Sequence, residues 1–410
     1  MVPEEWKRLI EPGFTIAPKH LARKRGKGHG RRIRVARRAR HHLMVASVLT
    51  VRGTPWWFVG IILIVSAPSP ASSQSHEELR VVTIAGGPES GTGEQFDPQA
   101  IAVAANGTAY VADYSGQRIC KVSPDGQVST FVGGFASKMW GISGLARARD
   151  GSLFVGNAEY QLVWKVSPEG ETELYAGPEP GSVSRKGEYR DGPREQALFD
   201  GPRVLGVDGE NRVFLCEWRA RIRLIDEKGV VSTLARLYGP FPLPPGYEPP
   251  PGVLDLPVDD VGNPAVSREG ALYHAWTQRV QGGQFVLYVY RLNTEREWKR
   301  LVVLRLKPDD PDIGRGLTCV LSREETHLWI IDSVSRFVGV IDLSANTMLN
   351  AGFRVLCHPV RQLEEGLQDG PWTTARQSKW WGGAAMDAEG NIVFSDGGNR
   401  RIRKRYLPKP

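Results

Sequence analysis

The chain has 410 residues, 41% of them hydrophobic, and a formal net charge of +8 at pH 7. This length admits two domains or one large β-domain, and such a basic balance would by itself suggest a nucleic-acid partner. The location of the positive charge excludes a nucleic-acid-binding function for most of the chain. Residues 1–42 carry 13 Lys and Arg against three Glu, whereas residues 53–410 carry 39 bases against 42 acids.

Two segments precede the region with β-strand patterns. Residues 1–42 are expected to be a basic, disordered extension. Residues 43–75 contain the apolar run "WWFVGIILIVSA" at 56–67, followed by small residues. This run is shorter than the ~20 residues of a membrane span and resembles a signal-peptide core. Met44 is an alternative start, which would make residues 1–43 an over-extended gene model.

A cleaved signal peptide and an uncleaved membrane anchor are both consistent with residues 43–75. Both predict that the domain is exported, whether secreted, periplasmic or anchored facing outward. Membrane contact is then expected only through the anchor, and an exported chain is expected to have no nucleic-acid partner.

A repeat of four short strands begins at residue 96. Residues 96–134 read "FDPQAIAVAANGTAYVADYSGQRICKVSPDGQVSTFVGG", with alternating apolar residues separated by "ANG" and "PDG" turns. The pattern recurs five times, in the ranges 142–177, 202–235, 264–306, 316–352 and 383–410. The last copy lacks its fourth strand, and "RVVTIAG" at 80–86 has the pattern of that strand. We therefore predict that the two ends of the domain pair with each other and close a ring.

The repeats resemble the NHL family, most clearly in 98–134 and in "AAMDAEGNIVFSDGGNRRIRK" near the C-terminus. The linkers "GEYRDGPREQALFDGPRVLGV" and "GLQDGPWTTARQSKWWGGAAM" are also similar to NHL inter-repeat segments. The resemblance implies an all-β fold: a single six-bladed β-propeller of four-stranded blades over residues 76–410. It implies little about function, because such propellers serve many roles.

A polar residue or Trp ends the predicted second strand of every repeat. The series is Asp113, Asn157, Glu217, Trp276, Asp332 and Asp396. In one interpretation the five polar members ring the central channel and hold Ca²⁺ or another divalent cation. In the other, each acid accepts hydrogen bonds from the turn that follows it and pairs with a nearby arginine such as Arg118 or Arg401.

The loops that lead into each repeat supply further candidates for ligand binding. Arg203 and Arg315 have the chemistry to clamp a carboxylate or phosphate, and Asn263 adds an amide. Tryptophans would stack on a sugar or flat ligand; the candidates are Trp140, Trp380 and Trp381 from these loops and Trp276 from the second-strand series. The alternative is that tryptophans wedge between blades and arginines bind neighbouring carbonyls. The proline-rich stretch 237–262 is either a lid or partner contact, or a tolerated insertion.

Two propeller enzyme families offer a catalytic alternative. Amidating lyases use histidine-bound zinc, but His76, His274, His327 and His358 are too dispersed to converge easily. Gluconolactonase-like enzymes hold a divalent cation with Glu, Asn and Asp, for which Glu217, Asn157, Asn263 and Asp396 have matching chemistry. The cysteines are expected to be buried free thiols, although export permits disulfides; they are Cys120, Cys216, Cys319 and Cys357.

The sequence favours an exported, monomeric binding module that presents its loop-rich face to a protein, peptide or saccharide. The alternative is a metal-dependent propeller hydrolase or lyase with its site at the channel mouth.

Overall fold

The computed structural model describes fourteen segments of the chain. They are residues 80–87, 96–133, 141–179, 188–217, 221–238, 254–257, 263–279, 285–306, 317–332, 337–345, 348–357, 366–372, 374–378 and 381–408. The predictions for residues 1–42 and 43–75 lie outside these segments. Within them, no helix has the length and apolar character needed to cross a membrane.

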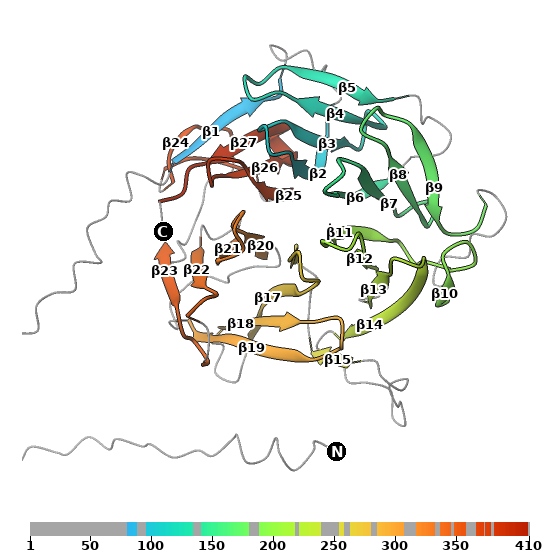
Figure 1. Cartoon of the computed structure of the whole chain (residues 1–410). Helices are drawn as coiled ribbons and strands as arrows, with labels where there is room; N and C mark the ends of the chain where they lie inside the picture. Colours follow the sequence, from blue (N-terminus) through green and yellow to red (C-terminus); the bar gives the residue numbers. More distant parts are fainter. Residues whose placement is uncertain are drawn as a thin grey trace, which may run out of the picture. The chain divides into compact units, whose positions relative to one another are not determined.

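Six sheets, antiparallel apart from one parallel pair in blade 3, are arranged around a central axis, which confirms the predicted all-β, six-bladed propeller (Figure 1). Blades 1 and 2 each run from the innermost to the outermost strand in chain order. Their strands are β2 (Pro98–Val103), β3 (Ala109–Asp113), β4 (Arg118–Val122) and β5 (Val128–Val132), then β6 (Ile142–Arg147), β7 (Leu153–Asn157), β8 (Leu162–Val166) and β9 (Thr172–Ala176).

Blade 3 has the same four-stranded core and two additional short strands. Its strands are β10 (Gly192–Pro193), β11 (Arg203–Val207), β12 (Val213–Cys216), β13 (Arg221–Ile225), β14 (Val230–Tyr238) and β15 (Leu254–Pro257). Blade 4 has longer strands, namely β16 (Ala265–Val266), β17 (Leu272–Arg279), β18 (Phe285–Leu292) and β19 (Trp298–Arg305). The sequence pattern predicted that this strand ends at Trp276. That prediction is wrong, because β17 continues to Arg279 and Trp276 lies within the strand.

Blades 5 and 6 complete the ring. Blade 5 contains β20 (Leu317–Leu321), β21 (His327–Asp332), β22 (Val338–Asp342) and β23 (Phe353–Cys357). Blade 6 contains β24 (Gly370–Pro371), β25 (Trp381–Met386), β26 (Ile392–Asp396), the 3₁₀ turn η3 (Gly397–Asn399), β27 (Arg401–Arg405) and, from the start of the domain, β1 (Arg80–Ala85).

The first strand closes the ring as predicted. β1 pairs antiparallel with β27, with Val81 opposite Arg405 and Thr83 opposite Arg403. The small strand β24 adds to the outer side of β1. The pairing supplies β27 with the fourth-strand partner that the last repeat lacks, so the blade has no unpaired edge at this position.

Glycines let the innermost strands approach one another near the axis. A Cβ built on Gly382 would lie 2.2 Å from the carbonyl oxygen of Gln99 in blade 1. A Cβ on Gly144 would lie 2.3 Å from the backbone nitrogen of Val204 in blade 3. Larger residues at these positions would push neighbouring blades apart, so the glycines set how narrow the channel is.

The hydrophobic core lies between the blades. In the contact between blades 3 and 4, for example, Phe214 and Leu224 pack with Leu272 and Trp276. Cys120, Cys216 and Cys319 are buried free thiols, as predicted. Burial raises the pKa of Cys120 to about 11 and that of Cys319 to about 12. The side chain of Cys357 lies outside the described part.

The proline-rich stretch 237–262 contributes one structural element to the described part. Its residues 254–257 form β15, which pairs in parallel with the end of β14 at the outer edge of blade 3. Residues 239–253 and 258–262 lie outside the described segments. The lid or partner role of this stretch therefore stays a prediction.

Candidate functional site

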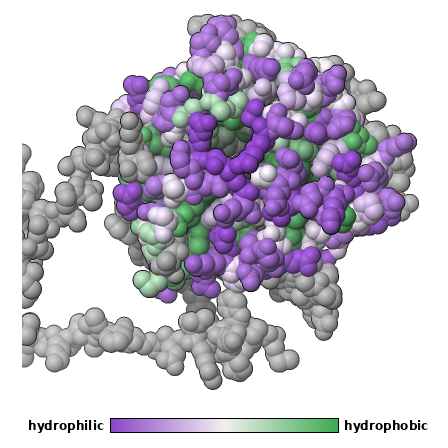
Figure 2. Space-filling view, viewed as in Figure 1, coloured by the Kyte–Doolittle hydropathy of each residue, from purple (hydrophilic) through white to green (hydrophobic). Residues whose placement is uncertain are grey.

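The innermost strands enclose a small channel cavity at the axis. It has a volume of about 60 Å³, enough for a few water molecules. Most of its wall is small or apolar, including Ala100, Gly144, Gly382 and Ala384. The polar side chains that line it are Ser143, Arg203 and Asn263. Figure 2 shows one face of the molecule, which is largely hydrophilic and has a hollow near the middle of the propeller.

Arg203 and Asn263 lie on the channel wall where blades 3, 4 and 5 meet. The Arg203 Nε donates to Cys216 Sγ at 3.2 Å, and its Nη1 donates to Asn263 Oδ1 at 3.4 Å. The Asn263 Nδ2 donates to Thr318 Oγ1 at 3.3 Å, and the backbones of Asn263 and Thr318 form a parallel bridge. Three blades thus share one chain of polar contacts, which we name the Arg203 cluster: Arg203, Cys216, Asn263 and Thr318.

His274 is buried on the second strand of blade 4, near this cluster. Its side chain stacks with Trp276 at 5.8 Å between ring centroids. Burial, with a smaller contribution from the Arg203 charge, lowers the pKa of His274 to about 4. The ring is therefore neutral at pH 7. Within the described residues no group hydrogen-bonds to its Nε2.

The predicted ring of polar residues is buried, and its described members bind groups of their own blades. Asp113 accepts hydrogen bonds from the backbone nitrogens of Asp97 (2.9 Å) and Gly116 (3.1 Å), and pairs with Arg118 at 2.8 Å. Asn157 accepts from the backbone nitrogen of Tyr160 at 2.9 Å. These contacts match the turn-capping interpretation for both residues.

Glu217 and Asp396 bind arginines that the sequence analysis did not single out. Glu217 pairs with Arg221 at 3.0 Å and with the fully buried Arg223 at 2.6 Å. Asp396 pairs with the fully buried Arg403 at 3.1 Å. The expected partner of Asp396, Arg401, instead donates to the carbonyls of Asn399 and Arg400.

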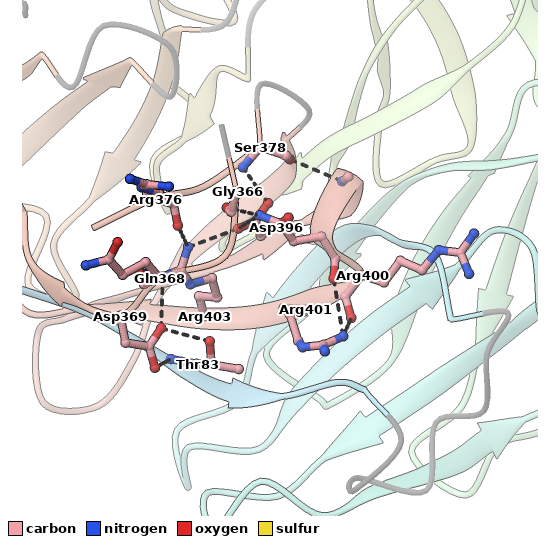
Figure 3. A network of polar contacts seen from close by, with 12 residues as sticks. Thr83, Gly366, Gln368, Asp369, Arg376, Ser378, Asp396, Arg400, Arg401 and Arg403 are labelled. Carbon is pink, nitrogen blue, oxygen red and sulfur yellow. Dashed lines mark hydrogen bonds and ion pairs between the residues drawn. The ribbon is translucent and has the colours of Figure 1, made fainter. Parts of the chain in front are cut away.

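Arg223 and Arg403 sit in two matching networks, one in blade 3 and one in blade 6. Arg403 also donates to Asp369 at 2.9 Å and to the carbonyls of Gln368 and Arg376. Asp369 in turn accepts from the backbone and hydroxyl of Thr83 in the closing strand (Figure 3). In blade 3 the corresponding residues are Arg223, Asp191 and Thr233.

The Asp-Gly-Pro tripeptide that recurs in both linkers, at 191–193 and 369–371, is the sequence signal that could have revealed these networks. Each Pro and the Gly before it form the short strand that pairs with the blade's outermost strand. Each Asp anchors the linker to a buried arginine. The two networks therefore hold linkers and blades together.

Other candidates lie elsewhere or outside the described part. Trp276 stacks on Tyr290, with ring centroids 4.3 Å apart, in the core between blades 3 and 4. Asp332 is buried at the end of β21, and its backbone nitrogen donates to the Phe337 carbonyl. Trp140, Arg315 and Trp380 lie outside the described segments, and Trp381 is described only through its backbone at the start of β25. Among the described residues, no three His, Cys, Asp or Glu side chains converge as a metal site requires.

No family model matches the sequence, and no curated protein matches it. Solved structures with similar folds include a virginiamycin B lyase from Staphylococcus aureus in complex with quinupristin, with 14% identity over 80% of this chain and 99% of that one, and a TM-score of 0.42. A gluconolactonase from Xanthomonas campestris is 13% identical over 80% and 90% of the two chains, with a TM-score of 0.46.

A protein of unknown function from Bacteroides thetaiotaomicron is 13% identical over 80% and 76% of the two chains, with a TM-score of 0.49. At these TM-scores the similarities carry no argument, and the propeller fold rests on the sheets of this chain itself. The NHL assignment stays a prediction, and the functions of these proteins carry no argument for this chain.

Proposed function

We propose that this protein is an exported, monomeric binding module that recognises a protein, peptide or saccharide through its loop-rich face. This face carries the loops between second and third strands and the loops that lead into each innermost strand. The register places both kinds at one end, since Asn157 at the end of β7 lies opposite Ile142 at the start of β6.

One observation carries the proposal. Three of the four carboxylates predicted to serve a metal are buried in ion pairs within their own blades, namely Asp113, Glu217 and Asp396. The polar side chains that line the otherwise apolar channel are instead hydrogen-bonding groups suited to recognition, from Ser143, Arg203 and Asn263.

Screening of the purified full chain on peptide and glycan arrays tests the proposal. Tyr160, on the loop after β7, is 39% exposed on the loop-rich face, and tyrosine is a frequent anchor of interfaces. We expect Tyr160→Ala to weaken binding of an array hit at least tenfold. Glu295→Ala, in an exposed turn between third and fourth strands at the opposite end, is the matched control and should leave affinity unchanged. Equal effects of both variants would contradict recognition through the loop-rich face.

The alternative, a metal-dependent hydrolase or lyase, would use Asp113, Asn157, Glu217, Asp332 or Asp396 as ligands of Ca²⁺ or another divalent cation. It would require the carboxylates described above to exchange arginine for metal. Elemental analysis of the full chain tests it. One tightly bound divalent ion per chain, together with turnover of a lactone or a lyase substrate, would replace the binding proposal.

Export is tested separately, by N-terminal sequencing of the native protein. A mature N-terminus between residues 67 and 76 would support a cleaved signal peptide, and a peptide from residues 1–43 would contradict the start at Met44.

A further inference from the structure

We propose that a pocket between blades 2 and 3, at the end of the propeller opposite the loop-rich face, binds one neutral sugar unit. The inference goes beyond the proposed function, because it concerns a different face of the molecule. It holds whether or not the loop-rich face binds a partner.

The pocket lies where blades 2 and 3 stand side by side (Figure 1). Its volume is about 210 Å³, against about 60 Å³ for the channel cavity. At ~30 Å³ for each water molecule, the pocket holds about seven waters. A single sugar ring with its hydroxyls matches this size. The lining residues are Asp150, Phe154, Lys165 and Tyr175 from blade 2 and Glu210, Asn211 and Glu227 from blade 3.

Tight turns between strands form the mouth of the pocket. Asp150 lies between β6 and β7, Glu210 and Asn211 lie between β11 and β12, and Glu227 lies between β13 and β14. These are connections between first and second or third and fourth strands, so they lie at the end opposite the loop-rich face. All four residues are exposed, and a solute therefore reaches the pocket directly from solvent.

Two aromatic rings form an apolar wall on the blade 2 side. Phe154 on β7 and Tyr175 on β9 meet edge to face, with ring centroids 4.8 Å apart and planes at 76°. Phe154 is buried, whereas Tyr175 is half-buried. The Arg194 guanidinium lies 4.8 Å from the centroid of the Tyr175 ring. The ring is thus held in place before a ligand arrives, and it offers apolar contact to the C–H groups of a sugar at little cost in conformational entropy.

Lys165 and Asn211 supply hydrogen-bond donors to the pocket. Lys165 lies on β8 directly opposite Phe154, and its ion pair with the exposed Glu173 is long, at 3.8 Å. Asn211 has a φ of 62°, a conformation that asparagine tolerates better than most residues. Within the described part of the chain, no hydrogen bond engages its side-chain amide. Both side chains therefore have donors to offer a ligand.

Three carboxylates supply the acceptors. Asp150 accepts from the backbone nitrogen and hydroxyl of Ser152 in its own turn. Glu210 pairs with Arg212 at 3.0 Å. The Glu227 carboxylate makes no hydrogen bond to another described residue. Each carboxylate has two oxygens and about four lone-pair sites, so all three keep capacity to accept from a ligand.

The mixture of donors and acceptors determines the class of ligand. An anion would face three carboxylates. A cationic group is the main competitor, but it only donates and would leave the Lys165 and Asn211 donors without an acceptor. Each sugar hydroxyl both donates and accepts, so a neutral sugar unit satisfies both kinds of group while its C–H groups contact Tyr175.

Saturation-transfer NMR on the full chain tests the site, with the methyl glycosides of D-glucose, D-galactose, D-mannose and N-acetyl-D-glucosamine as probes. We expect saturable binding of at least one glycoside, with the same affinity at low and high salt, because no ligand charge is involved. Methylamine is the cationic comparison. Absence of saturable glycoside binding, or tighter and salt-sensitive binding of methylamine, would overturn the proposal.

Variants in exposed turns locate the binding without disturbing the core. Glu227→Ala should weaken glycoside binding about tenfold, as expected for a hydrogen bond to a charged group. Asn211→Gly keeps the positive φ accessible and should weaken it about fivefold. Glu169→Ala is the matched control, because Glu169 is exposed in the corresponding turn of blade 2 and does not line the pocket. Unchanged binding by Glu227→Ala, or an equal loss in Glu169→Ala, would overturn the proposal.

Tyr160→Ala separates this site from the loop-rich face. It should bind the glycoside like the unaltered protein, and loss of glycoside binding in this variant would overturn the pocket. An array partner that depends on Tyr160, with no glycoside binding, would likewise refute the pocket and leave the proposed function standing. Glycoside binding that depends on Glu227, without any array partner that depends on Tyr160, would refute the proposed function and leave the pocket standing.

Discussion

Replacement of Arg403 by methionine should open the ring at its closing strand. Arg403 is fully buried and holds Asp396, Asp369 and two backbone carbonyls. Arg403→Met keeps much of the side-chain volume but leaves the buried Asp396 carboxylate without its cation. Removing one partner of a buried ion pair costs about 3–5 kcal/mol. Asp396 retains hydrogen bonds from Ser378 and Asn399. We therefore expect the free energy of unfolding to fall by about 3 kcal/mol, the lower end of this range.

Two further variants separate the loss of the buried ion pair at the closing strand from the loss of an ion pair elsewhere in the protein. Lys165→Met removes a partly exposed ion pair with Glu173 at 3.8 Å and should cost at most about 1 kcal/mol. Arg223→Met breaks the matching network in blade 3, away from the closing strand, and should cost less than Arg403→Met, because Glu217 keeps Arg221 as a cation. Urea unfolding measures the change in the free energy of unfolding of each variant, with Lys165→Met as the reference for a surface ion pair.

Native-state hydrogen exchange then locates the opening. In Arg403→Met, the amides of β1 at residues 81–85 should exchange faster, because Asp369 loses its arginine and holds Thr83 less firmly. In Arg223→Met, the β1 amides should keep their protection apart from any global effect. The reasoning would be refuted if Arg403→Met costs no more than Lys165→Met, or if both arginine variants expose β1 equally.

Three further predictions follow from packing and ionisation. Gly382→Ala should destabilise the propeller by about 1–3 kcal/mol, because the new Cβ would meet the Gln99 carbonyl; an unchanged urea midpoint would contradict this. His274, with an ordinary pKa near 6.5 lowered to about 4, binds its proton more readily in the unfolded state, so stability should fall as pH drops from 6.5 towards 4, by up to about 3 kcal/mol. His274→Phe should remove this component from pH-dependent unfolding curves, and identical curves would oppose the assignment. Burial raises the pKa of Cys120 and Cys319, so iodoacetamide at pH 8 should label both only after unfolding, and rapid labelling of the native protein would show that they are accessible.

Much of the fold could be predicted because it depends on local patterns. The alternating strands with glycine turns at 96–134 predict four antiparallel strands, and β2 to β5 have that arrangement. The absence of a fourth strand after Arg405 and its presence at Arg80–Ala85 predict closure, which β1 and β27 confirm. Side-chain alternation and turn chemistry are read within a few residues, so no knowledge of distant contacts is needed.

The candidate site could be predicted only in part. The sequence places Arg203 and Asn263 in loops that lead into blades, and the structure brings both to the channel. It also suggests Trp276 as a ligand contact, whereas the long strand β17 carries that ring into the core between blades. The sequence left open whether Glu217 holds a metal or an arginine, and Arg221 and Arg223 bind it in the same manner as Arg403 binds Asp396.

The repeat, the strand order and the closure of the ring can be predicted from residue spacing alone. Which polar residues hold the blades together depends on contacts between residues that are distant in the chain. Asp369 reaches Thr83 across 286 positions of the chain, and Arg203 reaches Asn263 across 60. The packing of neighbouring blades around the axis determines these partners. A polar residue that binds a buried arginine and one that lines a channel have the same sequence pattern, so the sequence does not distinguish them.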